Sequence, residues 1–261
     1  MQTELISDSA VDLARRFGGI ERLYGAGSVA WLAGARVCVV GVGGVGSWVV
    51  EALARSGIGA LCLIDLDNIA ESNINRQAHA LDATLGQAKV DAMAARVSGI
   101  NPQCRVTTVE DFITPENVAD LLRTGEFEIV VDAVDQVSAK LAMAAICRRQ
   151  GVALVMAGGA GGKSDPRQIR ADDLARTEQD PLLSRLRARL RREYGFPRDP
   201  GKKFGIEAVY SIEPPRPPVA CAPRGLSCAG YGSSMMMTAS LGLVIAERVV
   251  ARLLRAGRDE R

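Results

Sequence analysis

Short apolar runs in this chain alternate with longer segments in which apolar residues recur at helical spacing. The runs predict strands at residues 37–40, 61–64, 105–109, 129–131 and 153–156. The segments between them predict helices at residues 44–56, 86–99, 115–123 and 137–149. Because strand and helix alternate, the pattern predicts a Rossmann-like α/β fold, with a mostly parallel sheet and helices on both faces.

The two ends of the chain depart from this alternation. Residues 9–34 have helical spacing, whereas residues 163–226 are polar, arginine-rich and then proline-rich. A last strand is expected near residues 208–212. The apolar run 235–246 is shorter than the roughly 20 residues that span a membrane, so it predicts a buried helix. We expect a single domain over residues 1–261, with a nucleotide-binding core at about 30–162, a basic, loop-rich substrate region at about 163–226 and a C-terminal helix at about 232–255.

Composition narrows the class of protein. The 261 residues are 48% hydrophobic, which is enough for one large core, and the net charge of +2 alone neither favours nor excludes nucleic acid. The polar N-terminus has no signal-peptide core, and the six cysteines form no CxxC pair. Without such pairs the usual tetracysteine zinc site is missing. We therefore expect a cytoplasmic protein with no zinc and no membrane span.

A glycine-rich loop, GVGGVG, lies between the first predicted strand and its helix. Its residues Gly41, Gly43, Gly44 and Gly46 let the backbone approach a phosphate, and the helix N-terminus supplies N–H donors. Asp65 ends the second strand, where a carboxylate can accept hydrogen bonds from a ribose. This pattern alone fits a nicotinamide or flavin enzyme, and a loop used only for packing is the alternative.

The residues that follow favour a triphosphate instead. Charged and amide side chains come next, at Asp67, Asn73, Arg76, Gln77 and Lys89. Cations in this place can balance the charge of a departing pyrophosphate. Asp132 and Asp135 follow the fourth strand, where a carboxylate can hold magnesium against phosphates. The set predicts an ATP and magnesium site, although Asp132 and Asn75 fit a structural role equally well.

Five motifs in order, GVGGVGS, DLD, NINRQ, GQAKV and VDAVD, resemble the superfamily of ubiquitin-activating and sulfur-carrier adenylyltransferases. These enzymes adenylate a carboxylate at the α-phosphate of ATP. The resemblance implies catalytic roles for Arg76, Lys89 and Asp135, with Asp135 as the magnesium ligand. It implies ATP contacts from the glycine loop, from Asp65 at the ribose, and from Asp67, Asn73 and Gln77 at the triphosphate.

The resemblance also implies a homodimer in which an arginine of one subunit enters the partner's site. Sulfur-carrier enzymes carry that arginine in an RYxRQ-like stretch, whereas this chain has ARRFGGIERLYG with glycine at the corresponding place. Arg16 or Arg22 is the candidate replacement. The alternative is that both arginines are ordinary surface residues of a helix.

One branch of the superfamily matches over residues 6–250. The stretches RFGGIERLYG, NINRQAHAL, INPQCRV and AGGAGG resemble the tRNA threonylcarbamoyladenosine dehydratases. The resemblance implies ATP-dependent cyclisation of threonylcarbamoyladenosine in tRNA, and association with a cysteine-desulfurase system. A sulfur-carrier adenylyltransferase is the alternative, although the missing CxxC pairs count against it.

Three further features bear on the substrate. A basic helix suits a tRNA backbone, with a solvated charged face as the alternative, through Arg185, Arg187, Arg189, Arg191 and Arg192. Cys228 lies where relatives run a loop toward the active site, so it is a possible nucleophile, while His79 is expected to be structural. The AGGAGG stretch predicts either a close-packed turn or a monovalent-cation site.

Overall fold

The computed structural model describes residues 12–123, 126–199, 201–216 and 231–259. Within these residues, seven strands form one sheet in the order β3-β2-β1-β4-β5-β7-β6. The strands are β1 (Arg36–Val40), β2 (Ala60–Ile64), β3 (Arg105–Val109), β4 (Ile129–Asp132), β5 (Ala153–Ala157), β6 (Ile169–Asp173) and β7 (Glu207–Ser211). The helices are α1 (Leu13–Tyr24), α2 (Ser28–Gly34), α3 (Gly46–Arg55), α4 (Lys89–Ile100), α5 (Val118–Leu121), α6 (Val137–Gln150), α7 (Pro181–Glu193) and α8 (Met235–Asp259). All strand pairs are parallel except β6 with β7.

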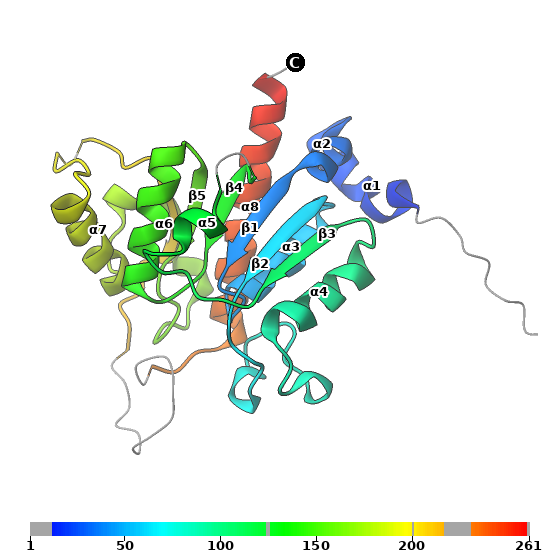
Figure 1. The fold of residues 1–261 in the computed structure, drawn as a ribbon, viewed down its shortest axis with the longest axis horizontal. Coiled ribbons are helices and arrows are strands. Elements are labelled where there is room, and N and C mark those ends of the chain that lie inside the picture. Colours follow the sequence, from blue (N-terminus) through cyan, green and yellow to red (C-terminus); the bar gives the residue numbers. More distant parts are fainter. Residues whose placement is uncertain (1–11, 124–125, 200, 217–230, 260–261) are drawn as a thin grey trace, which may run out of the picture.

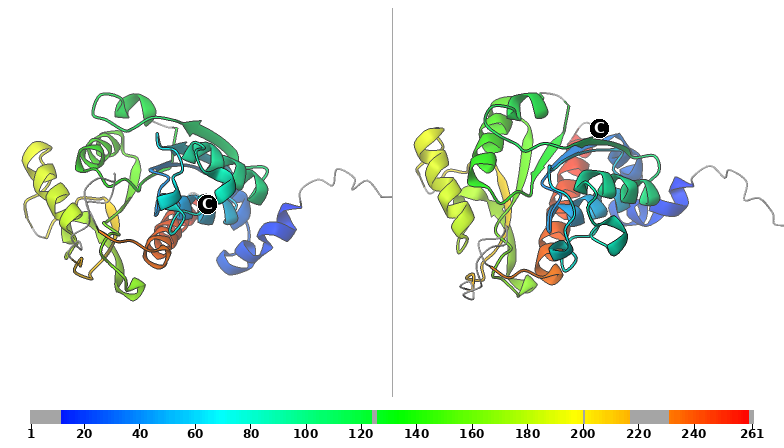
Figure 2. Two further views of the ribbon diagram at one scale, coloured as in Figure 1. Left: turned by 90° about the horizontal axis from the view of Figure 1, so that it is seen from below. Right: turned by 60° about the horizontal axis from the view of Figure 1, so that its bottom comes forward.

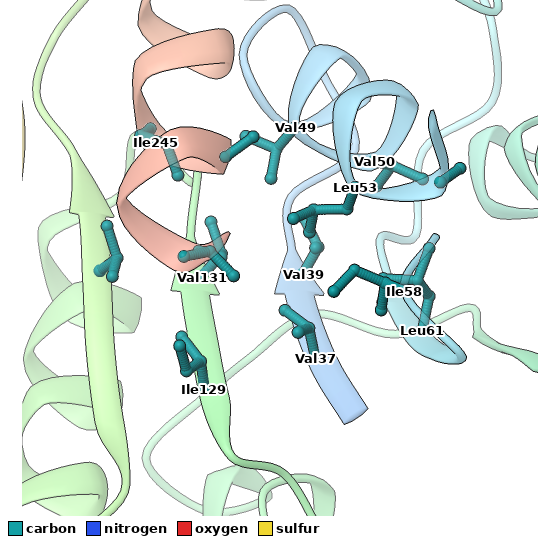
Figure 3. Close-up of a cluster of buried hydrophobic side chains, with 14 of the residues drawn as sticks. Val37, Val39, Val49, Val50, Leu53, Ile58, Leu61, Ile129, Val131 and Ile245 are labelled. Atoms are coloured by element: carbon teal, nitrogen blue, oxygen red, sulfur yellow. The ribbon is translucent and has the colours of Figure 1, made fainter. Parts of the chain in front are cut away.

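Two apolar cores lie on opposite faces of this sheet. Val37 and Val39 of β1 pack with α3, α4 and α8, while Cys38 and Val40 pack with α5, α6 and α7. Figure 3 shows the first core, where Val49 of α3 and Ile245 of α8 face the strands. Successive side chains of a strand point to opposite faces of the sheet, and here both faces are buried. The predicted strands are therefore continuous apolar runs.

The order of the strands creates a crevice. β1 lies between β2 and β4, so the chain leaves β1 in one direction and later returns to its other side. Ligands of open α/β sheets bind at this switch point, at the carboxyl ends of the strands. Figure 1 shows the loops between β2 and α4 at this end of the sheet, and α1 and α2 at the opposite end.

The structure differs from the expected elements in three places. The predicted helical stretch 9–34 is divided at Gly25 and Gly27, whose positive φ angles of 100° and 84° break the helix. The helix expected at 115–123 covers only Val118–Leu121. The stretch expected to be loop-rich contains β6, which the sequence did not predict because this edge strand is mostly exposed and polar. Among the described residues, no helix is long and apolar enough to span a membrane.

Candidate active site

Asp65 connects the loops that follow β1 and β2. Its Oδ2 accepts a hydrogen bond from the backbone N–H of Val42 at 2.7 Å, and its Oδ1 accepts one from that of Asp67 at 2.9 Å. Asp65 is 9% exposed, and burial raises the pKa of its carboxyl although the Lys89 ammonium opposes this shift. Asp65 therefore shapes the glycine loop, and its contact with a ribose stays a prediction.

The glycines of the loop have two different roles. A Cβ on Gly46 would lie 1.7 Å from the Gly41 carbonyl oxygen, and one on Gly41 would lie 2.9 Å from the Ala133 carbonyl group. A Cβ on Gly43 would meet its nearest neighbour, Gln77 Nε2, only at 3.9 Å. Packing thus explains Gly41 and Gly46, whereas the space at Gly43 is available to a ligand.

Arg76 lies against this loop. A Cβ on Gly44 would be 3.4 Å from the Cγ and Cδ atoms of Arg76. The Arg76 guanidinium donates to the Ser72 carbonyl oxygen at 2.7 Å and to Asn75 Oδ1 at 2.9 Å. Asn75 also donates from Nδ2 to the Ser233 carbonyl oxygen at 2.9 Å. Asn75 therefore orients Arg76 and connects it to the segment before α8.

Lys89 is the first residue of α4 and its side chain is 7% exposed. Its Nζ lies 2.6 Å from Oδ2 of Asp67 and 3.8 Å from Oδ1 of Asp65. The Asp67 side chain is 58% exposed, so the ammonium lies at the inner side of an open loop. Asn73 is buried, and its Oδ1 accepts from the Ala70 N–H at 3.1 Å, which closes the turn that precedes Arg76.

Asp132 and Asp135 are in different environments. Asp132 is fully buried, and its Oδ1 accepts from Lys140 Nζ at 3.0 Å. Lys140 also donates to the Ala157 carbonyl oxygen at 2.8 Å, which joins the ends of β4 and β5. Asp132 therefore has a structural role, whereas Asp135 is exposed in the loop after β4.

The AGGAGG loop after β5 is held by two charged residues that the sequence did not reveal. A Cβ on Gly158 would lie 2.5 Å from Asp180 Oδ2. Lys163 donates from Nζ to the Ser211 carbonyl oxygen at 2.8 Å and lies 3.4 Å from Asp180 Oδ2. This geometry supports the close-packed turn, and the monovalent-cation site stays a prediction. The Asp-Pro pair that begins α7 is the sequence signal that could have identified Asp180 as a cap.

His79 is enclosed in the protein. It is 2% exposed, and neither ring nitrogen has a hydrogen-bond partner among the described residues. Burial, together with the charges of Lys89 and Arg96, lowers its pKa to about 4. A neutral, buried imidazole is consistent with the structural role expected for His79. Cys228 lies outside the described residues.

The arginines expected to act across a dimer are both on α1. Arg16 donates from Nη1 to the Ile100 carbonyl oxygen at 2.8 Å, and Arg22 is exposed. Figure 1 shows α1 at the amino ends of the strands. Within one chain, both arginines therefore lie at the end of the sheet opposite the glycine loop.

Two of the α7 arginines point toward the protein. Arg187 donates to Thr177 Oγ1, and the Arg191 guanidinium lies 5.3 Å from the centre of the Phe204 ring. Arg189 and Arg192 form ion pairs with Glu193 at 2.9 and 2.6 Å, and Arg185 is exposed. The predicted contact of these arginines with tRNA is not tested by this geometry.

A hollow of about 400 Å³ lies elsewhere, lined by Tyr24, Trp31 and Leu254 among others. It is between α2 and the C-terminal part of α8, and no residue of the predicted ATP site lines it. We therefore place the candidate site by the strand order and by the charged groups described above.

Known proteins resemble this chain over very different lengths. The sequence profile of the ThiF family matches residues 19–260. A tRNA threonylcarbamoyladenosine dehydratase from Haemophilus influenzae is 48% identical over 246 residues, which cover 92% of this chain and 94% of that relative. A molybdopterin-synthase adenylyltransferase from Escherichia coli is 36% identical over 120 residues, 46% of this chain and 47% of that relative. The similarity to the dehydratase thus spans twice as much of the chain.

Comparison with solved structures also finds similarity to a dehydratase over nearly the whole chain. The E. coli tRNA N6-threonylcarbamoyladenosine dehydratase in complex with ATP has a TM-score of 0.88 to this chain at 44% sequence identity, covering 98% of this chain and 100% of that one. The same enzyme in complex with AMP has a TM-score of 0.87. The chain belongs to the ThiF family and, within it, to the tRNA threonylcarbamoyladenosine dehydratases.

Proposed function

We propose that this chain catalyses the ATP-dependent dehydration of threonylcarbamoyladenosine beside the anticodon of tRNA. The threonyl carboxylate attacks the α-phosphorus of ATP, which gives an acyl-adenylate and releases pyrophosphate. The carbamoyl group of the same side chain then attacks the activated carbonyl carbon and expels AMP. The nucleoside loses one water in total, and ATP ends as AMP and pyrophosphate.

One observation carries this proposal. An open glycine loop and two cations, Arg76 and Lys89, lie at the switch point of the sheet. The chain is also similar, over most of its length, to dehydratases whose structures were solved with ATP and with AMP. Cations beside a phosphate-binding loop can stabilise charge on a departing pyrophosphate, which is the role proposed for Arg76 and Lys89. Because the partner of Lys89, Asp67, is largely exposed, phosphate oxygens can replace it without burying a new charge.

Ring closure places few demands on the protein. Both reacting groups belong to one substituent, so binding alone can bring them into reacting geometry. A dedicated nucleophile and base are therefore unnecessary. The enclosed, neutral His79 agrees with this, because a buried imidazole with a pKa near 4 is poorly suited to general-base chemistry at neutral pH.

Asp135 fits the proposed magnesium site. Magnesium is usually held by one or two carboxylates together with substrate phosphates rather than by a cage of protein ligands. Asp135 is exposed in the loop after β4, at the carboxyl end of that strand. When bound, the ion would neutralise phosphate charge, and Asp135 would hold it in place.

A homodimer is part of the proposal. Met236 and Leu243 are 64% and 51% exposed on α8 and, seven residues apart, lie on one face of the helix. Ile74, 42% exposed, precedes the loop of Arg76. An apolar helix face next to the site supports a subunit contact there. In such a dimer, Arg16 or Arg22 would act in the partner's site.

The remaining expectations concern the cellular context. Cys38, Cys62, Cys104 and Cys147 are free thiols in the described residues, as a reducing cytoplasm requires. A tRNA substrate agrees with that compartment. Association with a cysteine-desulfurase system rests on the family resemblance alone.

The test is direct turnover. The protein is incubated with magnesium, ATP and tRNA that carries threonylcarbamoyladenosine, and the nucleosides are then released gently and weighed. We expect loss of one water from the modified nucleoside together with one AMP per turnover. An unchanged nucleoside would refute the proposal, and AMP formation that requires a small protein ending in Gly-Gly would favour the sulfur-carrier alternative.

A further inference from the structure

Helix α7 extends along the side of the molecule, away from the active site. Its N-cap residue Asp180 accepts a hydrogen bond from the Gly159 N–H at 2.9 Å, at the carboxyl end of β5. Thirteen residues at about 1.5 Å each give a length of about 20 Å. The far end of α7 packs near the end of α6, where the Arg148 guanidinium lies 4.2 Å from the centre of the Phe196 ring. Figure 2 shows α7 (yellow-green) on the opposite side of the molecule from α1 (blue).

Positive charge is concentrated on this side. Residues 181–203 contain eight basic and two acidic residues, whereas the whole chain has a net charge of only +2. The rest of the chain is therefore net negative. A polyanion that approaches the protein is thus attracted to this segment in particular.

Only some of these cations are free of contacts within the described chain. Arg187 and Arg191 point toward the protein, and Arg189 and Arg192 are engaged with Glu193. Five exposed cations have no ion pair within the described residues: Arg149 at the end of α6, Arg185 near the start of α7, and Arg198, Lys202 and Lys203 after it. We call these five residues the α6–α7 track.

We propose that the α6–α7 track binds the phosphate backbone of the anticodon stem while the modified base lies in the active site. The proposal rests on the proposed function. Arg185 lies near the active-site end of α7, which is about 20 Å long. Beyond its other end, Phe196 contacts both Arg148, the neighbour of Arg149 in the chain, and Phe204, which follows Lys202 and Lys203. A helical RNA stem that leaves the anticodon loop presents phosphates along such a path. Proteins contact RNA stems mainly through backbone and shape, so the track would add affinity without reading sequence.

Binding at several salt concentrations tests the proposal without turnover. Fluorescence anisotropy with a labelled anticodon stem-loop would compare the wild-type protein with Arg149→Glu and with Lys202→Glu/Lys203→Glu. We expect each variant to bind several-fold more weakly at low salt and to lower the log–log salt slope by about one for each lost phosphate contact. The control matched to Arg149→Glu is Arg105→Glu, which also reverses one charge, at an exposed position of β3 at the other edge of the sheet.

A kinetic comparison distinguishes binding of the anticodon stem from binding of the modified base. The track variants should raise KM for whole modified tRNA while leaving kcat unchanged. With a single-stranded loop oligonucleotide that carries the same modified base, their KM should equal that of the wild-type protein. Thermal melting should be unaltered, because the substituted side chains are exposed.

Two results would contradict the proposal that the α6–α7 track binds the anticodon stem. One is wild-type affinity and salt slope in both track variants, and the other is an equal loss in Arg105→Glu, which would indicate a general effect of charge. Failure of the wild-type protein to dehydrate modified tRNA would instead refute the proposed function, and the anisotropy measurement would still report on the track.

Discussion

Asp132 and Asp135 are three residues apart in the sequence, yet one is enclosed and the other is exposed. The sequence placed both at the end of a strand and could not separate them, because the partner of Asp132 is Lys140 from the following helix. Burial makes that partner necessary, since an unpaired charge in the interior is strongly unfavourable. The pair of Lys163 and Asp180 could not be predicted either, because its two residues are 17 positions apart and meet only in the folded chain. Local motifs could be predicted, whereas pairs that form only when separate elements pack together could not.

Substituting the two aspartates should therefore affect different properties. Asp132→Asn leaves Lys140 without its ion pair and should cost about 3–5 kcal/mol of unfolding free energy. Asp135→Asn should change stability by less than about 0.5 kcal/mol, but lower AMP formation by about 100-fold or more. Urea unfolding and AMP assays measure the two effects. Normal turnover by folded Asp135→Asn would contradict the site assignment.

His79 should make folding stability depend on pH. Its pKa in the folded protein is about 4, below the 6.5 of a free histidine, so the fold favours the neutral form. The resulting stability is fully present above pH 6.5 and is lost as the pH falls from 6.5 toward 4, by roughly 3 kcal/mol in all. The wild-type protein should thus lose more stability over this range than His79→Leu, which cannot titrate.

Denaturant unfolding at pH 7.5, 5.5 and 4.5, values that cover most of this range, would measure the difference between the two proteins. Comparison with the variant removes the contribution of carboxyl groups, which titrate in both. Parallel stability curves would show that His79 does not titrate as described. Activity of His79→Leu at neutral pH should remain, because the proposed reaction does not use this residue.

At the scale of elements, the strands buried on both faces were predictable, and so was the exposed edge strand β3, whose sequence RVTTV is rich in β-branched residues. β1, β2, β4 and β5 appear in the sequence as apolar runs because their residues contact a core on each side. β6, the other edge strand, has the sequence IRADD, which contains neither an apolar run nor several β-branched residues, so it was not predicted. The glycine loop was predicted from its motif, but the motif does not show which glycines are required for packing. The distances from each glycine to its neighbours show this.

Alanine substitutions in the loop test this division. Gly46→Ala would place a Cβ 1.7 Å from the Gly41 carbonyl oxygen, so it should destabilise the fold by about 3 kcal/mol or more. Gly43→Ala has no close neighbour in the protein, and its melting temperature should be unchanged. Its KM for ATP should nevertheless rise by about tenfold or more, because the methyl group fills the approach to a phosphate. Unaltered ATP affinity in Gly43→Ala would show that phosphate does not bind there.

At the scale of the whole molecule, the proposed function includes a homodimer. α1 lies at the amino ends of the strands, so its arginines can complete a site only in a partner. The family and the fold were predictable from ordered motifs, which are local in sequence. The surface proposed for subunit contact was not predictable, because it depends on exposed side chains that the fold brings together, such as Met236 and Leu243 on α8.

Mixed dimers test the shared site. Arg16→Ala/Arg22→Ala and Asp135→Asn should each be inactive alone. Mixing equal amounts under conditions of subunit exchange should restore roughly a quarter of wild-type activity, because half of the dimers are mixed and each has one intact site. Adding Leu243→Glu to both partners should yield monomers in analytical ultracentrifugation and abolish this recovery. Activity that never recovers on mixing would place the required groups within one chain.

The central claim is that the threonyl carboxylate is adenylated, and the fate of its oxygen tests this most directly. A tRNA whose threonylcarbamoyl carboxylate carries ¹⁸O at both oxygens is turned over once with unlabelled ATP. The account predicts one ¹⁸O in the phosphate of AMP and the other in the cyclised nucleoside, because the carboxylate oxygen bonded to the α-phosphorus leaves with AMP. Unlabelled AMP, or ADP with labelled inorganic phosphate, would contradict it.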